Sequence, residues 1–344
     1  MQKEITESHE LLDDNGHLIE SGKAKNLILK YNRSKVKAGK LRIKEWDYYE
    51  VLNENYGIIL LYHDVGYLGV AQVAWMDYNA GTYEELQEQV WFAKGKMNLP
   101  PGDQTDIVFD RNGNHWECLR RGEDRIFKFN FPKFRNGAGI SGEITLKQPK
   151  EMDGMVNVIP FPKKKQFVYA LKLHNMIPNG KVKIGEEEYE FTDENGSNGV
   201  LDWTRAVFPY HLEWRWSAFN GKVNGKPFGL LVDYGVKNFG TESNKDMVFI
   251  DFKGQYLDKV HYTWNKDDPH KDWHFKSVND DRVSGIMKVK WVHKGGMNFV
   301  VLKTQVLKAY GFFIGTVKLD DGTIVEIKEE DRVFGHAEAV INYW

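Results

Sequence analysis

The sequence predicts an all-β fold composed of two similar barrel-like halves. Hydrophobic and polar residues alternate with a period of two along most of the chain, as in Lys288–His293 and Gly322–Ile327, and this period is typical of half-buried strands. Turn-forming pairs such as Asn112-Gly113 and Asn220-Gly221 recur at short intervals, which suits tight connections between antiparallel strands. Short strands joined by tight turns indicate a sandwich or a barrel.

One hairpin can be predicted in register. A two-residue turn at Gly185-Glu186 would place opposite charges, and one apolar pair, across the two strands. The predicted pairs are Lys183 with Glu188, Lys181 with Glu190, and Val182 with Tyr189. We expect little helix. The best candidate starts at Thr82, where Thr82-Tyr83-Glu84-Glu85 reads as a capping box before Leu86–Trp91.

The two halves carry a faint internal repeat. Glu45-Trp46-Asp47-Tyr48 precedes an apolar segment ending at Asp64, and Glu213-Trp214-Arg215-Trp216 precedes a similar segment ending at Asp233. A tandem duplication explains the repeat, and a chance match in a chain rich in Glu, Trp and Gly explains it nearly as well. A polar segment over residues 148–156 suggests a boundary. We therefore expect one barrel over residues 1–150 and another over residues 151–344, the second carrying the candidate site.

Composition favours small molecules over charged polymers as partners. Lys and Arg number 47 against 49 Asp and Glu, so the 344-residue chain has a net charge of −2. Without a strongly basic face, general binding to nucleic acid or to an anionic membrane is not expected. Tryptophan occurs 11 times, mostly within alternating segments, so rings are available to line a ligand site.

The expected compartment is the cytoplasm. The single cysteine, Cys118, excludes an internal disulfide and suits a reducing environment. It lies in the strand-like segment His115–Leu119 and is expected to be a half-buried structural thiol. Residues Met1–Glu7 lack the apolar core of a signal peptide. No apolar run approaches the roughly 20 residues that cross a bilayer, so membrane insertion is not expected.

Candidate site residues concentrate between Leu171 and Glu242. Three could take part in catalysis, namely Asp202, His174 and Glu242. Others could contact a ligand through rings, a guanidinium or a carboxylate, and these are Trp203, Arg205, Tyr210, Trp214, Trp216 and Asp233.

Strand alternation places Trp214 and Trp216 on one face, with Glu213 and Arg215 on the other. If the indoles face a hollow, they form an aromatic wall for a ligand. If they do not, they fill a core, which is the commoner outcome for an aromatic stripe at strand spacing.

Asp202 has two possible roles. A carboxyl group buried beside aromatic rings tends to hold its proton and could act as a general acid. Asp202 and Arg205 lie three residues apart in an expected turn, and an ion pair between them would instead be structural. His174 beside Asn175 suits a satisfied polar pair better than a catalytic base. No Ser or Cys in an elbow context supports a hydrolase triad.

No metal or cofactor is expected. His270-Lys271-Asp272-Trp273-His274 offers two imidazoles and a carboxylate, but the segment follows Asp267-Asp268-Pro269 and reads as a passage from loop to strand. The chain has no P-loop, and Gly137-Ala138-Gly139 lies in a β context without a following helix, so it is no dinucleotide fingerprint.

Several segments in order along the chain resemble one protein family. They are Lys44–Tyr49, Asp64–Gly69, Asn157–Pro160, His174-Asn175 with Pro178, Asp202–Tyr210, Trp214-Arg215-Trp216 and Thr241–Asn244. Together they are similar to a widespread bacterial family of unknown function, usually grouped with carotenoid 1,2-hydratase and AttH-like lipocalin-related proteins. The resemblance runs from about Leu11 to Trp344. The ending departs from the charged one expected, with His336-Ala337-Glu338 and Asn342–Trp344 in its place.

The resemblance implies two tandem lipocalin-like (calycin-type) antiparallel β-barrels. The wider group includes hydratases and cyclases that act on hydrophobic substrates. Two small-molecule functions therefore stay open, beside a structural or interaction module, which a fully packed aromatic wall without a cavity would favour. One is acid-catalysed hydration, cyclisation or elimination of a hydrophobic or sugar-like molecule, with Asp202 as the acid and His174 or Glu242 as an auxiliary. The other is non-catalytic binding of such a ligand in an aromatic-lined pocket. Whether the protein is an enzyme is left open by the sequence.

Overall fold

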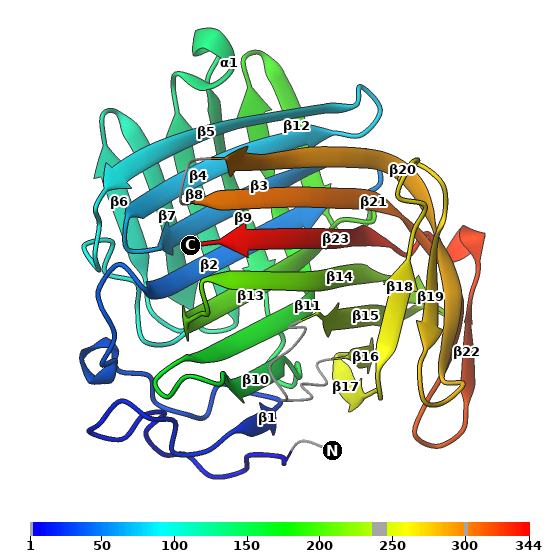
Figure 1. The fold of residues 1–344 in the computed structure, drawn as a ribbon. Helices are drawn as coiled ribbons and strands as arrows, with labels where there is room; N and C mark the ends of the chain where they lie inside the picture. Colours follow the sequence, from blue (N-terminus) through cyan, green and yellow to red (C-terminus); the bar gives the residue numbers. More distant parts are fainter. Residues whose placement is uncertain (1–2, 236–245, 299–301) are drawn as a thin grey trace. The chain divides into compact units, whose positions relative to one another are not determined.

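The computed structural model describes residues 3–235, 246–298 and 302–344, and its elements are almost entirely antiparallel strands (Figure 1). By its internal contacts the chain divides into a first unit, Glu4–Phe208, and a second unit, Pro209–Trp344. Each unit holds one curled antiparallel sheet, a barrel in one case and a half-barrel in the other. The predicted fold class is confirmed. No helix among the described residues is long and apolar enough to cross a membrane.

The first sheet has thirteen strands, and ten of them follow one another in the order β5-β4-β3-β2-β13-β11-β9-β8-β7-β6. Its strands are β1 (Gly22–Ala24), β2 (Ile43–Leu52), β3 (Tyr56–Asp64), β4 (Leu68–Asp77), β5 (Thr82–Trp91), β6 (Ile107–Arg111), β7 (Asn114–Arg121), β8 (Asp124–Phe131), β9 (Ile140–Lys147), β10 (Met155–Pro160), β11 (Phe167–Ile184), β12 (Glu187–Thr192) and β13 (Asn198–Val207). A 3-10 turn, η1 (Arg33–Lys35), precedes β2, and the one-turn α1 (Phe134–Gly137) joins β8 to β9.

The helix predicted from Thr82 is wrong. These residues form the edge strand β5, which pairs with β4 along its whole length, from Thr82 opposite Asp77 to Trp91 opposite Leu68. The local capping signal is overridden because the segment can extend an existing ladder, in which pairing with β4 satisfies the backbone groups on one side of β5.

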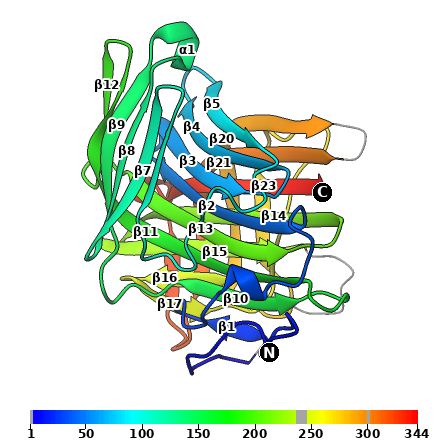
Figure 2. The same ribbon diagram turned by 90° about the vertical axis from the view of Figure 1, so that its left-hand side faces the viewer.

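Side chains close the first sheet into a barrel where its two end strands approach each other. The Glu88 carboxylate of β5 lies 3.1 Å from Arg111 Nε and accepts hydrogen bonds from Asn112 and Asn114. Within the barrel, the Tyr62 ring stacks on Trp116 at 5.3 Å. Figure 2 shows β7, β8 and β9 side by side in this wall.

The predicted hairpin is confirmed as β11 and β12. Lys183 pairs with Glu188, Lys181 with Glu190, and Val182 with Tyr189. The Lys181 ammonium lies 2.7 Å from the Glu188 carboxylate and 3.0 Å from that of Glu190.

The division into units falls between Phe208 and Pro209, whereas the sequence suggested a boundary after residue 150. The physical reason is strand pairing: β11 pairs with β9, and β13 pairs with β2, so residues 151–208 complete the first sheet.

The second sheet has ten strands, nine of which follow the order β17-β16-β15-β14-β23-β21-β20-β19-β18. They are β14 (His211–Val223), β15 (Lys226–Tyr234), β16 (Met247–Ile250), β17 (Lys253–Tyr256), β18 (Val260–Thr263), β19 (Trp273–Ser277), β20 (Val283–Asn298), β21 (Lys303–Lys318), β22 (Ile324–Ile327) and β23 (Phe334–Tyr343), with a 3-10 turn η2 (Glu329–Asp331) before β23. Figure 1 shows β20, β21, β23, β14 and β15 side by side.

The two sheets repeat one strand order. In each, a four-strand meander (β2 to β5, or β14 to β17) starts beside the sheet's last strand (β13 or β23). The other neighbour of that last strand is a long strand (β11 or β21) that also carries a short side strand (β12 or β22). The repeated sequence segments lie on the equivalent hairpins β2–β3 and β14–β15, which favours tandem duplication over chance.

Candidate functional site

The two faces of the second sheet differ in chemistry. One face packs the apolar core of the unit, which includes Phe219 of β14 and Val232 of β15. The opposite face carries Trp214 and Trp216, because alternate residues of a strand point to opposite sides. The prediction that these two indoles share a face is confirmed by the unbroken pairing of β14 with β23. Neither indole belongs to the apolar cluster around Phe219, and Trp216 is itself buried, at 3% exposure.

A lysine–glutamate pair lies beside these indoles. Cross-strand pairing aligns Trp216 with Glu338 of β23, and Glu338 with Lys308 of β21. The Lys308 ammonium lies 3.6 Å from Glu338 Oε2, and Trp214 Nε1–H donates to Glu338 Oε1 at 2.9 Å. Lys308 and Glu338 are only 5% and 8% exposed. Both charges are therefore buried, but paired, as buried charges must be.

Aromatic rings surround this pair. The Trp216 ring meets His336 edge to face at 4.5 Å, and the Lys308 ammonium lies 5.4 Å from the Trp216 ring and 5.5 Å from the Tyr310 ring. The Tyr310 ring stacks on Trp291 at 5.5 Å. A cation this close to two ring faces is stabilised by their quadrupoles. We call these residues the Lys308 face, which consists of Trp214, Trp216, Trp291, Lys308, Tyr310, His336 and Glu338.

The Lys308 face has a further imidazole, that of His293, next to it. His293 of β20 is paired across the strands with Lys308. Burial lowers the pKa of His293, and the Lys308 ammonium lowers it further. A neutral imidazole beside the ion pair can accept or pass a proton. The face thus combines a carboxylate, an ammonium and an imidazole with a wall of rings, the groups needed for proton transfer on an apolar molecule.

The structure places Asp202 in a different ion pair from the one predicted. Asp202 and Arg205 lie on the strand β13, three residues apart, and therefore on opposite faces. Asp202 lies 2.6 Å from the Lys172 ammonium of β11 and accepts a hydrogen bond from Thr204 Oγ1. The predicted Asp202–Arg205 pair is wrong.

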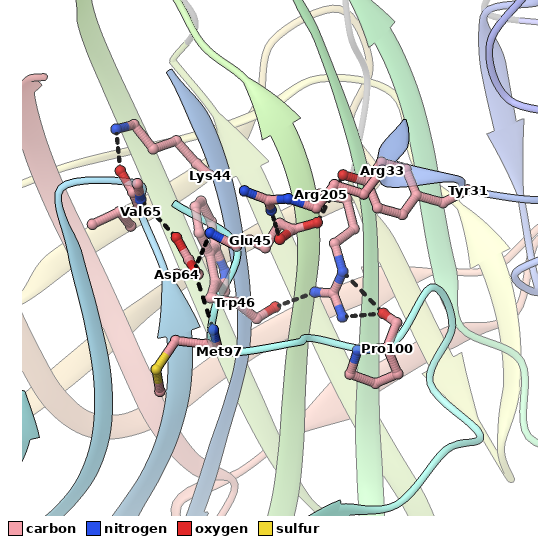
Figure 3. A network of polar contacts seen from close by, with 12 residues as sticks. Tyr31, Arg33, Lys44, Glu45, Trp46, Asp64, Val65, Met97, Pro100 and Arg205 are labelled. Atoms are coloured by element: carbon pink, nitrogen blue, oxygen red, sulfur yellow. Dashed lines mark hydrogen bonds and ion pairs between the residues drawn. The ribbon is translucent and has the colours of Figure 1, made fainter. Parts of the chain in front are cut away.

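Arg205 is part of a buried network in the first unit (Figure 3). Its guanidinium lies 2.8 Å from the Asp47 carboxylate and donates to the carbonyls of Trp46 and Pro100. The side chain is 0% exposed. In the same view, Glu45 accepts from Tyr31 and pairs with Arg33. These contacts join β13 to β2 and to the loop that carries Pro100. We therefore assign Arg205 a structural role.

The other first-unit candidates are buried. Trp203 is 0% exposed, lies 4.2 Å from the Arg205 guanidinium and meets Tyr169 edge to face at 5.3 Å. His174 is 1% exposed and lies with Asn175 where the pairing of β11 with β13 shifts between Leu173 and Met176.

The remaining candidates belong to the second unit. Tyr210 is 51% exposed, with its ring 5.9 Å from Tyr343. Asp233 is buried and pairs across the strands with Trp216, so it borders the Lys308 face. Glu242 lies outside the described residues.

A shallow pocket of about 610 Å³ lies elsewhere in the second unit, lined by Asn265, Lys271, Asp272 and His274. Its lining residues are polar or charged and include no Trp, Tyr or Phe, unlike most small-molecule sites. Within the described ranges, no group of three His, Cys, Asp or Glu side chains is placed to hold a metal ion.

Sequence reasoning missed the residues that complete the Lys308 face. Lys308 and Tyr310 alternate on β21, and His336 and Glu338 alternate on β23. This spacing placed each pair on one strand face, but nothing local indicated that both strands lie beside Trp216. Their sequence distance from Trp214 concealed the connection.

A model of the family described as "Domain of unknown function (DUF2804)" matches residues 2–344. No curated protein matches the chain. Similar solved structures include an AttH protein from Nitrosomonas europaea, at 12% identity and a TM-score of 0.43, over 92% of this chain and 97% of that one. Kievitone hydratase from Nectria haematococca has 10% identity and a TM-score of 0.47, over 98% and 97%. CghA has 10% identity and a TM-score of 0.39, over 98% and 96%.

Proposed function

Because the chain belongs to the DUF2804 family, whose description names no activity, we propose a function from its own geometry. The Lys308 face binds a small molecule with a planar or extended apolar surface and transforms it by proton transfer. The observation that carries this proposal is the buried Lys308–Glu338 pair enclosed by tryptophan, tyrosine and histidine rings, on the face opposite the apolar core.

Proton transfer to an alkene or enol ether creates positive charge on the substrate. The faces of Trp216 and Tyr310, which already lie near the Lys308 ammonium, would stabilise such a charge through their quadrupoles. Glu338 is the group we assign to proton transfer, with Lys308 and Trp214 positioning it. The reaction class is hydration, cyclisation or elimination.

Deuterium incorporation tests the reaction. The protein is incubated in D₂O with a panel of planar aromatic alkenes, enol ethers and linear polyenes, and products are analysed by mass spectrometry. We expect Glu338→Gln to bind its substrate but to lose at least 100-fold in rate, the lower range of general acid–base contributions (about 10²–10⁴). Asp202→Asn is the matched carboxylate control and should keep activity. Loss in Asp202→Asn with retention in Glu338→Gln would reverse this assignment.

The alternative is a non-catalytic ligand-binding protein that uses the same rings. It predicts no turnover by any variant, while Trp216→Leu weakens binding of the fluorescent probe 1-anilinonaphthalene-8-sulfonate. Ile324→Ser removes an apolar side chain that is 65% exposed and serves as the control. Unchanged probe affinity in both Trp216→Leu and Lys308→Met would contradict binding at this face altogether.

We propose the cytoplasm as the compartment. The lone Cys118 is buried, and burial raises its thiol pKa to about 12, which suits a structural thiol in a reducing environment.

A further inference from the structure

Two adjacent aromatic side chains are exposed at the end of β5 in the first unit. Trp91 is 64% exposed and Phe92 is 58% exposed, and Leu41 is 43% exposed. Single exposed apolar residues are ordinary on protein surfaces, but a group of large ones marks an interaction site.

These side chains come from segments that meet. The Phe92 N–H donates to the Tyr67 carbonyl at 2.7 Å, which joins the end of β5 to the turn between β3 and β4. The same turn approaches Leu41, because a Cβ placed on Gly66 would lie 2.7 Å from the Leu41 Cα. We call Leu41, Trp91 and Phe92, together with the neighbouring Lys40 and Lys94, the Trp91 patch. Tyr67 packs beneath it against the small apolar cluster Val65, Leu68 and Val70.

The patch is locally basic although the chain is nearly neutral. Residues 37–42, 65–68 and 91–98 contain no Asp or Glu, and their exposed cations are Lys37, Lys40, Lys94 and Lys96. Asp64, which directly precedes the turn between β3 and β4, is fully buried and accepts from the backbone N–H groups of Gly66 and Gly95. The exposed lysines of these segments therefore have no carboxylate within the same segments.

The backbone at Phe92 and Lys94 is strained. Phe92 has φ 53° and Lys94 has φ 52°, a left-handed conformation that is unfavourable for a bulky side chain. The Lys94 ammonium lies 5.6 Å from the Phe92 ring. The loop thus presents a ring and a cation together to the surface instead of burying the ring.

We propose that the Trp91 patch docks the protein on anionic lipid membranes. Tryptophan and phenylalanine favour the lipid–water interface, and neighbouring lysines are attracted to acidic headgroups. An anionic membrane supplies both features in one surface: negative charge for the lysines and an apolar phase for the rings. This docking goes beyond the activity proposed for the Lys308 face and is independent of it.

Vesicle flotation tests the proposal. The full chain is mixed with vesicles of phosphatidylcholine containing 30% phosphatidylserine, or of phosphatidylcholine alone. We expect binding to the anionic vesicles only, weakening as salt rises. Lys40→Gln with Lys94→Gln should reduce the affinity by more than tenfold, at roughly fivefold per lysine. Trp91→Ser with Phe92→Asn should also abolish flotation, and Asn tolerates the left-handed backbone.

Matched controls lie in other parts of the chain. Val278→Ser with Ile324→Ser removes two other exposed apolar side chains, at 49% and 65% exposure, and Lys163→Gln with Lys164→Gln removes two cations from another turn. Both should float like the parent protein. Equal loss in the controls, binding to neutral vesicles alone, or binding to a soluble acidic protein without flotation would overturn the proposal. Circular dichroism of each variant verifies that the surface changes leave the fold intact.

Discussion

Buried charges in the first unit are held by partners on neighbouring strands. Arg205 of β13 and Asp47 of β2 form such a pair at 2.8 Å, with exposures of 0% and 3%. A buried pair adds little net stability, but removing one member leaves the other without compensation. This asymmetry makes the pair a sensitive test of the network.

We expect Arg205→Leu to lower the free energy of unfolding by about 3–5 kcal/mol. Asp47→Leu combined with Arg205→Leu should recover part of this loss, because no charge is left unpaired. Arg121→Leu breaks an exposed pair with Asp106 and should cost below about 1 kcal/mol. Urea unfolding of the four proteins measures these differences. Equal losses for Arg205→Leu and Arg121→Leu would show that the buried network is not structural.

A second residue-scale prediction concerns His63. Burial lowers its pKa to about 4, with a further contribution from the Lys44 ammonium, whereas an unfolded histidine titrates near 6.5. Between these values the unfolded chain binds the proton and the folded chain does not. The free energy of unfolding must therefore fall as the pH drops from about 6.5 to about 4.

We expect His63→Gln to reduce the slope of the unfolding free energy against pH in that window, by the equivalent of up to one bound proton. Chemical unfolding at several pH values measures the slope, and His270→Gln, at an exposed position, should leave it unchanged. An unaltered slope in His63→Gln would mean that His63 is protonated in the folded protein near its ordinary pKa.

At the scale of elements, close strand pairing restricts side-chain size on β23. Gly335 pairs with Phe219 of β14, and a Cβ placed there would lie 1.9 Å from the Ala218 carbonyl oxygen. Because this atom belongs to the backbone of the central strand β14, it cannot move away as a flexible side chain could.

We expect Gly335→Ala to lower the free energy of unfolding by about 1–3 kcal/mol, the usual cost of overpacking. Gly102→Ala is the control, since nothing lies within 4 Å of its added Cβ. Thermal unfolding compares the two variants. A Gly335→Ala protein as stable as the control would mean that β14 and β23 are less closely paired than described.

At the scale of the whole molecule, strand pairing predicts which fragment folds. The fragment 4–208 contains every strand of the first sheet. The fragment 1–150 lacks β11 and β13, which join β9 to β2. We expect 4–208 to unfold cooperatively and to protect its strand amides from hydrogen exchange, and 1–150 to do neither. Cooperative unfolding of 1–150 alone would instead support a boundary near residue 150.

The sequence by itself determined the features that depend on neighbours along the chain. Alternation established the all-β class and the common face of Trp214 and Trp216, and charge complementarity established the register of the β11–β12 hairpin. Both signals are short in range, because a strand has a period of two and a tight turn sets its own register.

Only the tertiary structure decided which strands lie side by side. It paired Asp202 with Lys172 and Arg205 with Asp47, turned the expected helix into β5, and brought Lys308 and Glu338 beside Trp216. These neighbours come from strands far apart in the sequence. Their proximity results from sheet pairing and burial across the whole unit, and no local pattern encodes it.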